Sequence, residues 1–145
     1  MIKTPSLSLV QQLLDDGVDA LKDVGLVADL AAADESTLRS PSAFVLPAGG
    51  DFQDNKTPGR VAQTEASGFA VLLAFKDASR SGEAGIKDFE PVRDAVLEVL
   101  MGAKLEGAQS SIAIKRQRLV DFDRKKRRLW WQITCTFNHL HRPSE

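Results

Sequence analysis

The stretch that decides the fold is Leu129-Trp-Trp-Gln-Ile-Thr-Cys-Thr-Phe137, near the end of the chain. Every odd-numbered position in it is apolar, and every even-numbered position except Trp130 is polar. Successive side chains of a strand point to opposite faces of a sheet, so this period of two predicts a strand with one buried face. It is the most secure strand in the sequence, and the other elements are placed around it.

A second long strand is predicted at Arg60–Lys76, and its final part, Phe69–Phe75, is apolar at every position. Such a run is typical of a central strand covered on both faces, here by helices. Shorter strands are predicted at Val24–Val27, at Ser42–Pro47 between two prolines, and at Ser110–Phe122.

Helical spacing of apolar residues predicts two main helices. The first runs from Leu9 to Leu21, with Gly17 weakening its second half, and the second is marked by Phe89–Leu100 and closes near Gly102. The alanine-rich stretch Asp29–Ala33 is left open between an irregular segment and a further helical turn. Polar segments predict a long loop at Ala48–Gly59, a second at Asp77–Gly85, and a charged connection at Asp123–Arg128.

The resulting order is α-β-β-β-α-β-β, which predicts an α+β fold: a mixed, mostly antiparallel sheet with two main helices packed on it. The 145 residues fit one domain spanning 1–145, and 43% hydrophobic with 27% charged residues is the balance of a soluble globular protein. No apolar run is long enough to span a membrane, and the N-terminus has no signal-peptide core, so we expect synthesis in a cytoplasm.

Candidate catalytic residues fail on geometry. Cys135 and His139 point the same way on one strand, but their Cα atoms lie roughly 13 Å apart at about 3.3 Å per residue. Cys135 is therefore expected to be a small core residue. His139 and His141 share one face but lack further metal ligands, so an exposed terminal strand is the preferred interpretation. Gly49-Gly50 and Ser81-Gly82 lack both the spacing and the following lysine of a phosphate-binding loop. We expect no enzyme activity, no cofactor and no metal.

The basic run Arg124–Arg128 leaves three interpretations open. With Trp130 it is suited to a small nucleic-acid-binding module, in which basic groups hold phosphates and the indole stacks on a base. It also fits a charged hairpin tip kept soluble by its charge, or a surface that docks on an acidic neighbour. Charge is asymmetric along the chain: residues 1–58 hold nine acidic and four basic residues, while residues 104–145 hold ten basic and four acidic ones.

The element order, together with the character of five segments, resembles the phage tail terminator family, also called tail completion or minor tail proteins. The segments are Val24–Ala32 after the opening helix, Pro41–Pro47 with its polar loop, Val61–Phe75, Phe89–Leu100, and the closing pair that ends in Leu129–Phe137. A glycine-rich turn is usual before the final strand of that family, whereas this chain has Asp121–Arg128 there.

The resemblance implies a structural virion protein at the neck end of the tail, made in the host bacterial cytoplasm. It implies a homo-hexameric ring that caps the last ring of major tail tube protein, stops tube polymerisation and presents a surface to the head–tail connector. A passing contact with DNA in the lumen is compatible with this role, and no membrane is expected. The expected interface residues are the basic run and three polar residues of the long loop: Arg124, Lys125, Lys126, Arg127, Arg128, Asp51, Asp54 and Asn55.

Overall fold

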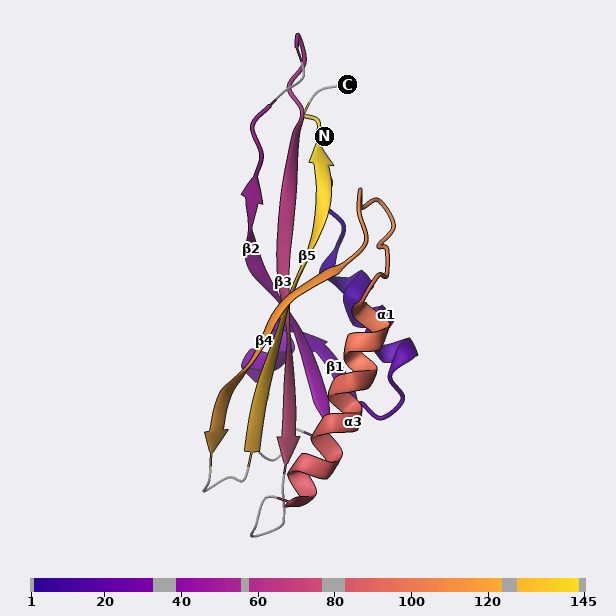
Figure 1. Ribbon diagram of the computed structural model, residues 1–145, viewed down its shortest axis with the longest axis vertical. Coiled ribbons are helices and arrows are strands. Elements are labelled where there is room, and N and C mark those ends of the chain that lie inside the picture. The colour runs from indigo at the N-terminus through magenta and orange to yellow at the C-terminus, as the bar shows by residue number, and fades with distance from the viewer. Residues whose placement is uncertain (1, 33–38, 56–57, 77–82, 124–127, 144–145) are drawn as a thin grey trace.

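The computed structural model describes residues 2–32, 39–55, 58–76, 83–123 and 128–143. It contains a five-stranded sheet in the order β1-β2-β3-β5-β4, in which only β1 and β2 run parallel to each other. This architecture, drawn in Figure 1, confirms the predicted mixed and mostly antiparallel α+β fold. The elements are α1 (Leu7–Gly17), β1 (Asp23–Leu26), α2 (Val27–Ala32), β2 (Ser42–Phe52), β3 (Gln63–Lys76), α3 (Glu83–Leu100), β4 (Ala113–Asp123) and β5 (Arg128–His141).

The two longest strands, β3 and β5, form the centre of the sheet. They pair without a break from Gln63↔His141 to Lys76↔Arg128, and Phe69 lies opposite Cys135. The predicted alternation therefore continues beyond Phe137 to the end of β5. Strand β3 begins at Gln63, three residues later than predicted.

Helix α1 is shorter than the apolar spacing predicts. Ser6 caps its start, because the Ser6 Oγ accepts a hydrogen bond from the Ser8 N–H at 3.2 Å. The helix ends at Gly17 rather than at Leu21, and a Cβ placed on Gly17 would lie 3.0 Å from a Val99 methyl carbon. Glycine thus permits the close approach of α1 to α3. Leu21 stays buried although it lies in the connection after the helix.

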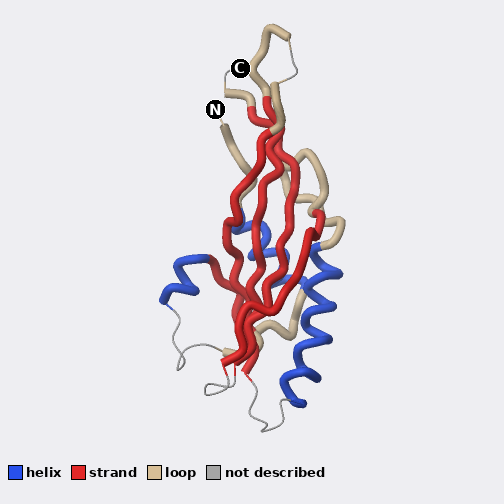
Figure 2. Tube along the Cα trace, turned by 60° about the vertical axis from the view of Figure 1, so that its left-hand side comes forward, coloured by secondary structure: helices blue, strands red, loops and turns tan. Residues whose placement is uncertain are grey.

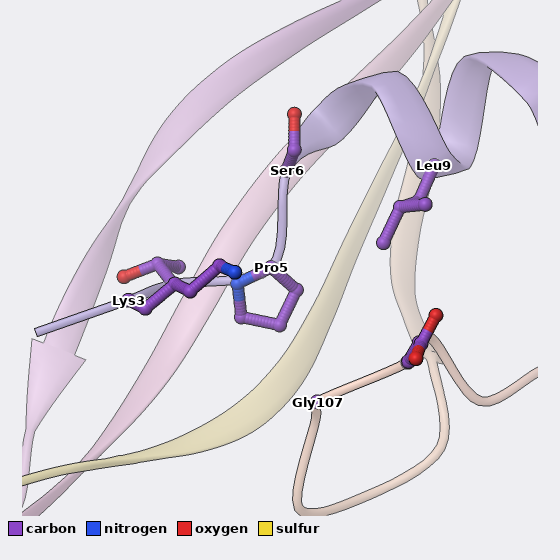
Figure 3. Close-up of a pocket in the computed structure, with 7 residues that line it drawn as sticks. Lys3, Pro5, Ser6, Leu9 and Gly107 are labelled. Atoms are coloured by element: carbon purple, nitrogen blue, oxygen red, sulfur yellow. The ribbon is translucent and has the colours of Figure 1, made fainter.

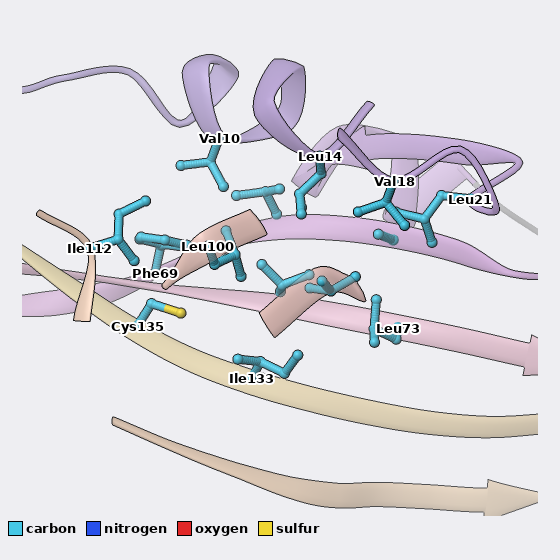
Figure 4. Packing of buried hydrophobic residues seen from close by; sticks show 14 of the residues in the cluster. Val10, Leu14, Val18, Leu21, Phe69, Leu73, Leu100, Ile112, Ile133 and Cys135 are labelled. Atoms are coloured by element: carbon cyan, nitrogen blue, oxygen red, sulfur yellow. The ribbon is translucent and has the colours of Figure 1, made fainter. Parts of the chain in front are cut away.

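The main core lies between the sheet and the helices α1 and α3. Figure 4 shows Val10 and Leu14 of α1 directed toward Phe69 and Leu73 of β3. All four side chains are fully buried. At about 1.5–3 kcal/mol for each large apolar side chain, this layer is the main source of stability for the fold.

A smaller apolar cluster covers the opposite face of the sheet. Phe44 and Ala74 are buried there, with Leu30 of α2, Leu72 and Trp130 packed against them. Figure 2 shows the short helix and the long α3 on opposite sides of the strands. Strand β3 is therefore covered by helices on both faces at this end, as its apolar run predicts. The helix on the second face is α2, which includes most of the alanine-rich stretch that the sequence leaves undecided.

The predicted loop Ala48–Gly59 is wrong in its first part, because β2 continues to Phe52. A shift of pairing between Pro47 and Gly50 interrupts the β2–β3 ladder, and Gly49 has φ +84°, which glycine adopts without strain. Every residue from Pro47 to Phe52 is exposed, so this half of the strand has no buried face and no alternating pattern to reveal it.

Two further boundaries differ from the prediction. Helix α3 begins at Glu83, which places the last residues of the predicted loop Asp77–Gly85 in the helix, and residues 77–82 lie outside the described residues. Strand β4 begins at Ala113 rather than Ser110. In the described part of the chain, no helix combines the length and apolar character needed to cross a membrane.

Candidate assembly surfaces

Cys135 is a core residue, as expected. Its side chain is fully buried, and its cross-strand neighbours are Phe69 and Ile114. Burial raises the pKa of the thiol to about 12, so the thiol stays protonated near neutral pH. A protonated thiol surrounded by apolar side chains is a poor nucleophile.

The two histidines are not exposed, contrary to the interpretation preferred from the sequence. His139 and His141 are 9% and 7% exposed, and their rings meet edge to face with centroids 4.8 Å apart. A His139 ring nitrogen lies 3.2 Å from the Gly107 carbonyl oxygen, and His141 Nε2 lies 2.8 Å from Glu65 Oε1. Strand β5 extends beyond Phe137, so both histidines are paired with β3 and their rings pack beside neighbouring residues. Among the described residues, no group of three or more His, Cys, Asp or Glu side chains is arranged to hold a metal ion.

A surface cavity of about 440 Å³ lies beside the start of α1 (Figure 3). Its only hydroxyl groups are those of Thr4 and Ser6, and the Ser6 hydroxyl is engaged with Ser8 in the helix cap. No histidine or cysteine is among the residues that line it. The lining residues are Lys3, Thr4, Pro5, Ser6, Leu9, Glu106 and Gly107.

The predicted interface residues of the polar segment divide between a strand and the turn after it. Asp51 lies in β2 opposite Ala66, and Asp54 follows the strand, with both side chains exposed. Asn55 closes the turn: its Nδ2 donates to the Arg60 carbonyl at 2.8 Å, and its Oδ1 accepts from the Ala62 N–H. The two carboxylates are available to a partner, whereas the Asn55 amide holds the turn.

The predicted basic run is mostly outside the description of the structure. Arg124, Lys125, Lys126 and Arg127 lie outside the described residues. Arg128 is the first residue of β5, pairs with Lys76 and Asp123, and is only 7% exposed. Its guanidinium carbon lies 5.8 Å from the centroid of the Trp130 ring. Arg128 therefore differs from a solvated tip residue.

Trp130 is half-buried and lies against Phe44, with ring centroids 6.4 Å apart. Its other neighbours are Arg128 and the apolar cluster beneath α2. The sequence interpretation treats this indole as an exposed platform for a base. The structure instead packs part of the indole against Phe44 and the cluster beneath α2.

The surface that sequence reasoning missed is the outer part of β4. Every residue from Lys115 to Phe122 is exposed, although the strand pairs with β5 along its length. Lys115, Arg116 and Arg118 make it basic, while Leu119, Val120 and Phe122 expose 51%, 44% and 43% of their surface. The signal was present: Lys115-Arg-Gln-Arg118 is polar at four successive positions, so a strand there has no face for the core.

Known proteins were compared with this chain by sequence and by structure. The family model of the phage tail terminator protein matches residues 3–144. The chain belongs to the phage tail terminator family. The resemblance stated from the sequence is therefore confirmed across almost the whole chain. Among curated proteins, no sequence matches.

A solved structure shares the fold of this tail terminator family member. The structure is described as the virion of a native gene transfer agent particle, and one of its chains is 17% identical. The alignment covers 95% of each chain with a TM-score of 0.52. Family membership makes this chain a structural protein of a phage-type tail, and its surfaces are best interpreted as contacts with other virion proteins.

Proposed function

We propose that this chain forms a ring that caps the finished tail tube, ends its polymerisation and provides the surface for head–tail joining. The observation that carries the proposal is the match to the tail terminator family over residues 3–144. The virion origin of the structural neighbour supports a place in a virion. The proposed location is the neck end of the tail, and the proposed site of synthesis is the host bacterial cytoplasm.

A ring needs two different patches on each subunit, because each copy contacts the next one head to tail. Strand β4 at the edge of the sheet, with its exposed apolar side chains, is one surface that suits this requirement. The proposed assembly is a homo-hexamer whose flat surfaces contact the major tail tube protein on one side and the head–tail connector on the other. No catalytic step enters the role.

A second function is favoured by one observation, the exposed row of Lys115, Arg116 and Arg118 on β4. Three cations within four residues attract phosphates, so a small nucleic-acid-binding module is the alternative. In the ring, the same cations would make a passing contact with DNA in the lumen. The packed position of Trp130 weighs against specific binding of bases.

The two functions are separated by mass measurement and a DNA titration. Purified protein, alone and with tail tube protein, is sized by light scattering and imaged by negative-stain electron microscopy. The ring proposal expects six-fold rings at tube ends and tubes that stop growing when the protein is added. Tubes that elongate unchanged, together with salt-sensitive binding of DNA by the monomer, would support the alternative instead.

A further inference from the structure

Two segments of the sheet, the far half of β2 and strand β4, have no neighbouring strand on their outer side and are called open here. Strand β1, two of whose backbone groups are bonded by side chains, is called the closed edge. Strand β1 pairs with β2 only from Ser42 to Val45, so the far half of β2 has no strand on its outer side. At the opposite edge, β4 has β5 on its inner side only. Because β4 pairs with β5 residues 128–136, whereas the far half of β2 pairs with β3 residues 65–67, the two open segments lie at diagonal corners of the sheet. In Figure 1 the far half of β2 lies toward the top of the sheet and the end of β4 toward the bottom.

Strand β1 shows what a closed edge looks like in this protein. The Gln11 Nε2 donates to the Val24 carbonyl at 2.8 Å, and the Asp29 Oδ2 accepts from the Leu26 N–H at 2.8 Å. Side chains of the same chain thus form hydrogen bonds with a backbone carbonyl and a backbone N–H of β1. Along β4, no such capping bond to the backbone from Lys115 to Phe122 occurs within the described residues.

Among the described residues, exposed bases outnumber exposed acids at the β4 corner, and exposed acids outnumber exposed bases at the β2 corner. On β4, Lys115, Arg116 and Arg118 are exposed, and Asp121 is the one exposed acid from Lys115 to Phe122. At the end of β2, Asp51 and Asp54 are exposed, and Arg60 is the exposed base among the described residues of the following turn, where Lys56 lies outside the description. Opposite charges at two edges of one chain favour contact between copies and disfavour contact of like edges.

Both corners also expose large apolar side chains. Leu119, Val120 and Phe122 occupy the β4 corner, whereas Phe52 is 57% exposed and Val61 is 61% exposed at the other. Of the eight large apolar side chains exposed in the described residues, five belong to the two corners, and the other three are Ile2, Val27 and Met101. Apolar residues gathered at charged strand edges are typical of a contact that excludes water.

The acidic corner is held rigid, which lowers the cost of ordering it on binding. The Phe52 ring lies 5.3 Å from the His141 ring. His141 contacts Glu65, and the Glu65 Oε1 also accepts a hydrogen bond from the Ser67 Oγ at 3.0 Å. This chain of contacts fixes Phe52 and the adjacent Asp51 to the central strands.

We propose that the β4 edge of one copy docks on the far half of β2, with its following turn, of the next copy. This inference rests on the proposed ring, since it names the two surfaces that join neighbouring subunits. Strands β2 and β4 run antiparallel within the chain, and rotation about a ring axis that is tilted from the strands by less than a right angle keeps the direction of each strand along that axis. The two edges therefore meet antiparallel, and their diagonal placement requires the strands to tilt relative to the ring axis.

Disulfide trapping tests the contact directly. Gln53→Cys places a thiol beside the acidic corner, and Val120→Cys places one on the β4 corner, while the native Cys135 is buried and unreactive. The two variants are mixed, assembled on tail tube protein and oxidised. We expect a single covalent dimer from the mixture and none from either variant alone. Val27→Cys on α2 replaces Gln53→Cys in the matched control, and this mixture should give no dimer.

Charge exchange provides a second measurement that does not depend on thiol geometry. The pair Arg116→Glu with Arg118→Glu should weaken ring assembly by about tenfold or more. Asp51→Arg with Asp54→Arg should do the same, and mixing the two double variants should restore assembly between unlike copies. Rings that form normally in wild type, with neither trapping nor charge complementation, would overturn the contact and leave the ring intact. If wild-type protein forms no ring on tube ends, the proposed function itself is wrong and the contact falls with it.

Discussion

Strands β3 and β4 both flank β5, yet they have opposite environments. From Phe69 to Phe75, every β3 side chain except Leu72 is buried. From Lys115 to Phe122, every β4 side chain is exposed. The two strands make the same kind of backbone ladder to the same neighbour, so the ladder alone does not explain why β4 has this composition.

The difference separates residues needed for folding from residues available for assembly. The β3 side chains complete a core between helices, and their apolar character follows from burial. An exposed edge strand is a place where other chains add on, and proteins usually protect it with charges and bulges. Strand β4 has both, with register shifts after Ile114 and after Leu119, but it also exposes three large apolar side chains. Roughly half of the surface of each of these apolar groups stays exposed to solvent in the monomer.

The largest predicted effect tests this division by matched truncations. Leu73→Ala removes a fully buried side chain from β3 and should lower the free energy of unfolding by about 2–5 kcal/mol. Leu119→Ala removes the same atoms from β4, where the side chain is 51% exposed, and should cost less than about 0.5 kcal/mol. Urea denaturation followed by tryptophan fluorescence measures both. Equal losses would mean that β4 belongs to the folding core.

The contrast between β3 and β4 also explains what could be predicted from the sequence. The alternation around Ile133 and the apolar run of β3 specify the centre of the sheet, because burial imposes a pattern on residues. The far half of β2 was predicted as a loop, because Ala48–Phe52 has no buried face and therefore no pattern. Contacts between distant segments left no local trace either, such as the bond of His141 to Glu65. The candidate surfaces were found only in part for the same reason: residues that await a partner are not constrained by their own fold.

A second prediction concerns Cys135, which lies on β5 between Phe69 of β3 and Ile114 of β4. Burial raises the pKa of its thiol from 9.0 to about 12. Above pH 9 the thiol ionises in the unfolded chain but not in the folded one, so its contribution to stability is present below pH 9 and is lost as the pH rises. The loss is about 1.4 kcal/mol per pH unit up to the folded pKa.

The measurement compares wild type with Cys135→Ala by urea denaturation at pH 8, 9 and 10 in the presence of a reducing agent. The variant lacks the thiol, so the stability difference between the two proteins should narrow above pH 9. A difference that stays constant with pH would show that solvent reaches Cys135 from the β4 side. The covered and exposed halves of the sheet would then be less distinct than the structure indicates.

The smallest predicted effect on stability concerns β1, the closed edge, which serves as a reference for β4, the open edge. Gln11→Ala removes the amide that donates to the Val24 carbonyl, and the loss of this hydrogen bond should cost about 0.5–1.5 kcal/mol. Gln12→Ala, next along the same helix and exposed, is the matched control and should cost almost nothing. Hydrogen exchange of the β1 amides provides a second measurement, since uncapping should speed exchange there and leave β3 unchanged. If Gln11→Ala has no effect on either measurement, capping does not distinguish β1 from β4, and the bare β4 edge loses its significance as a docking surface.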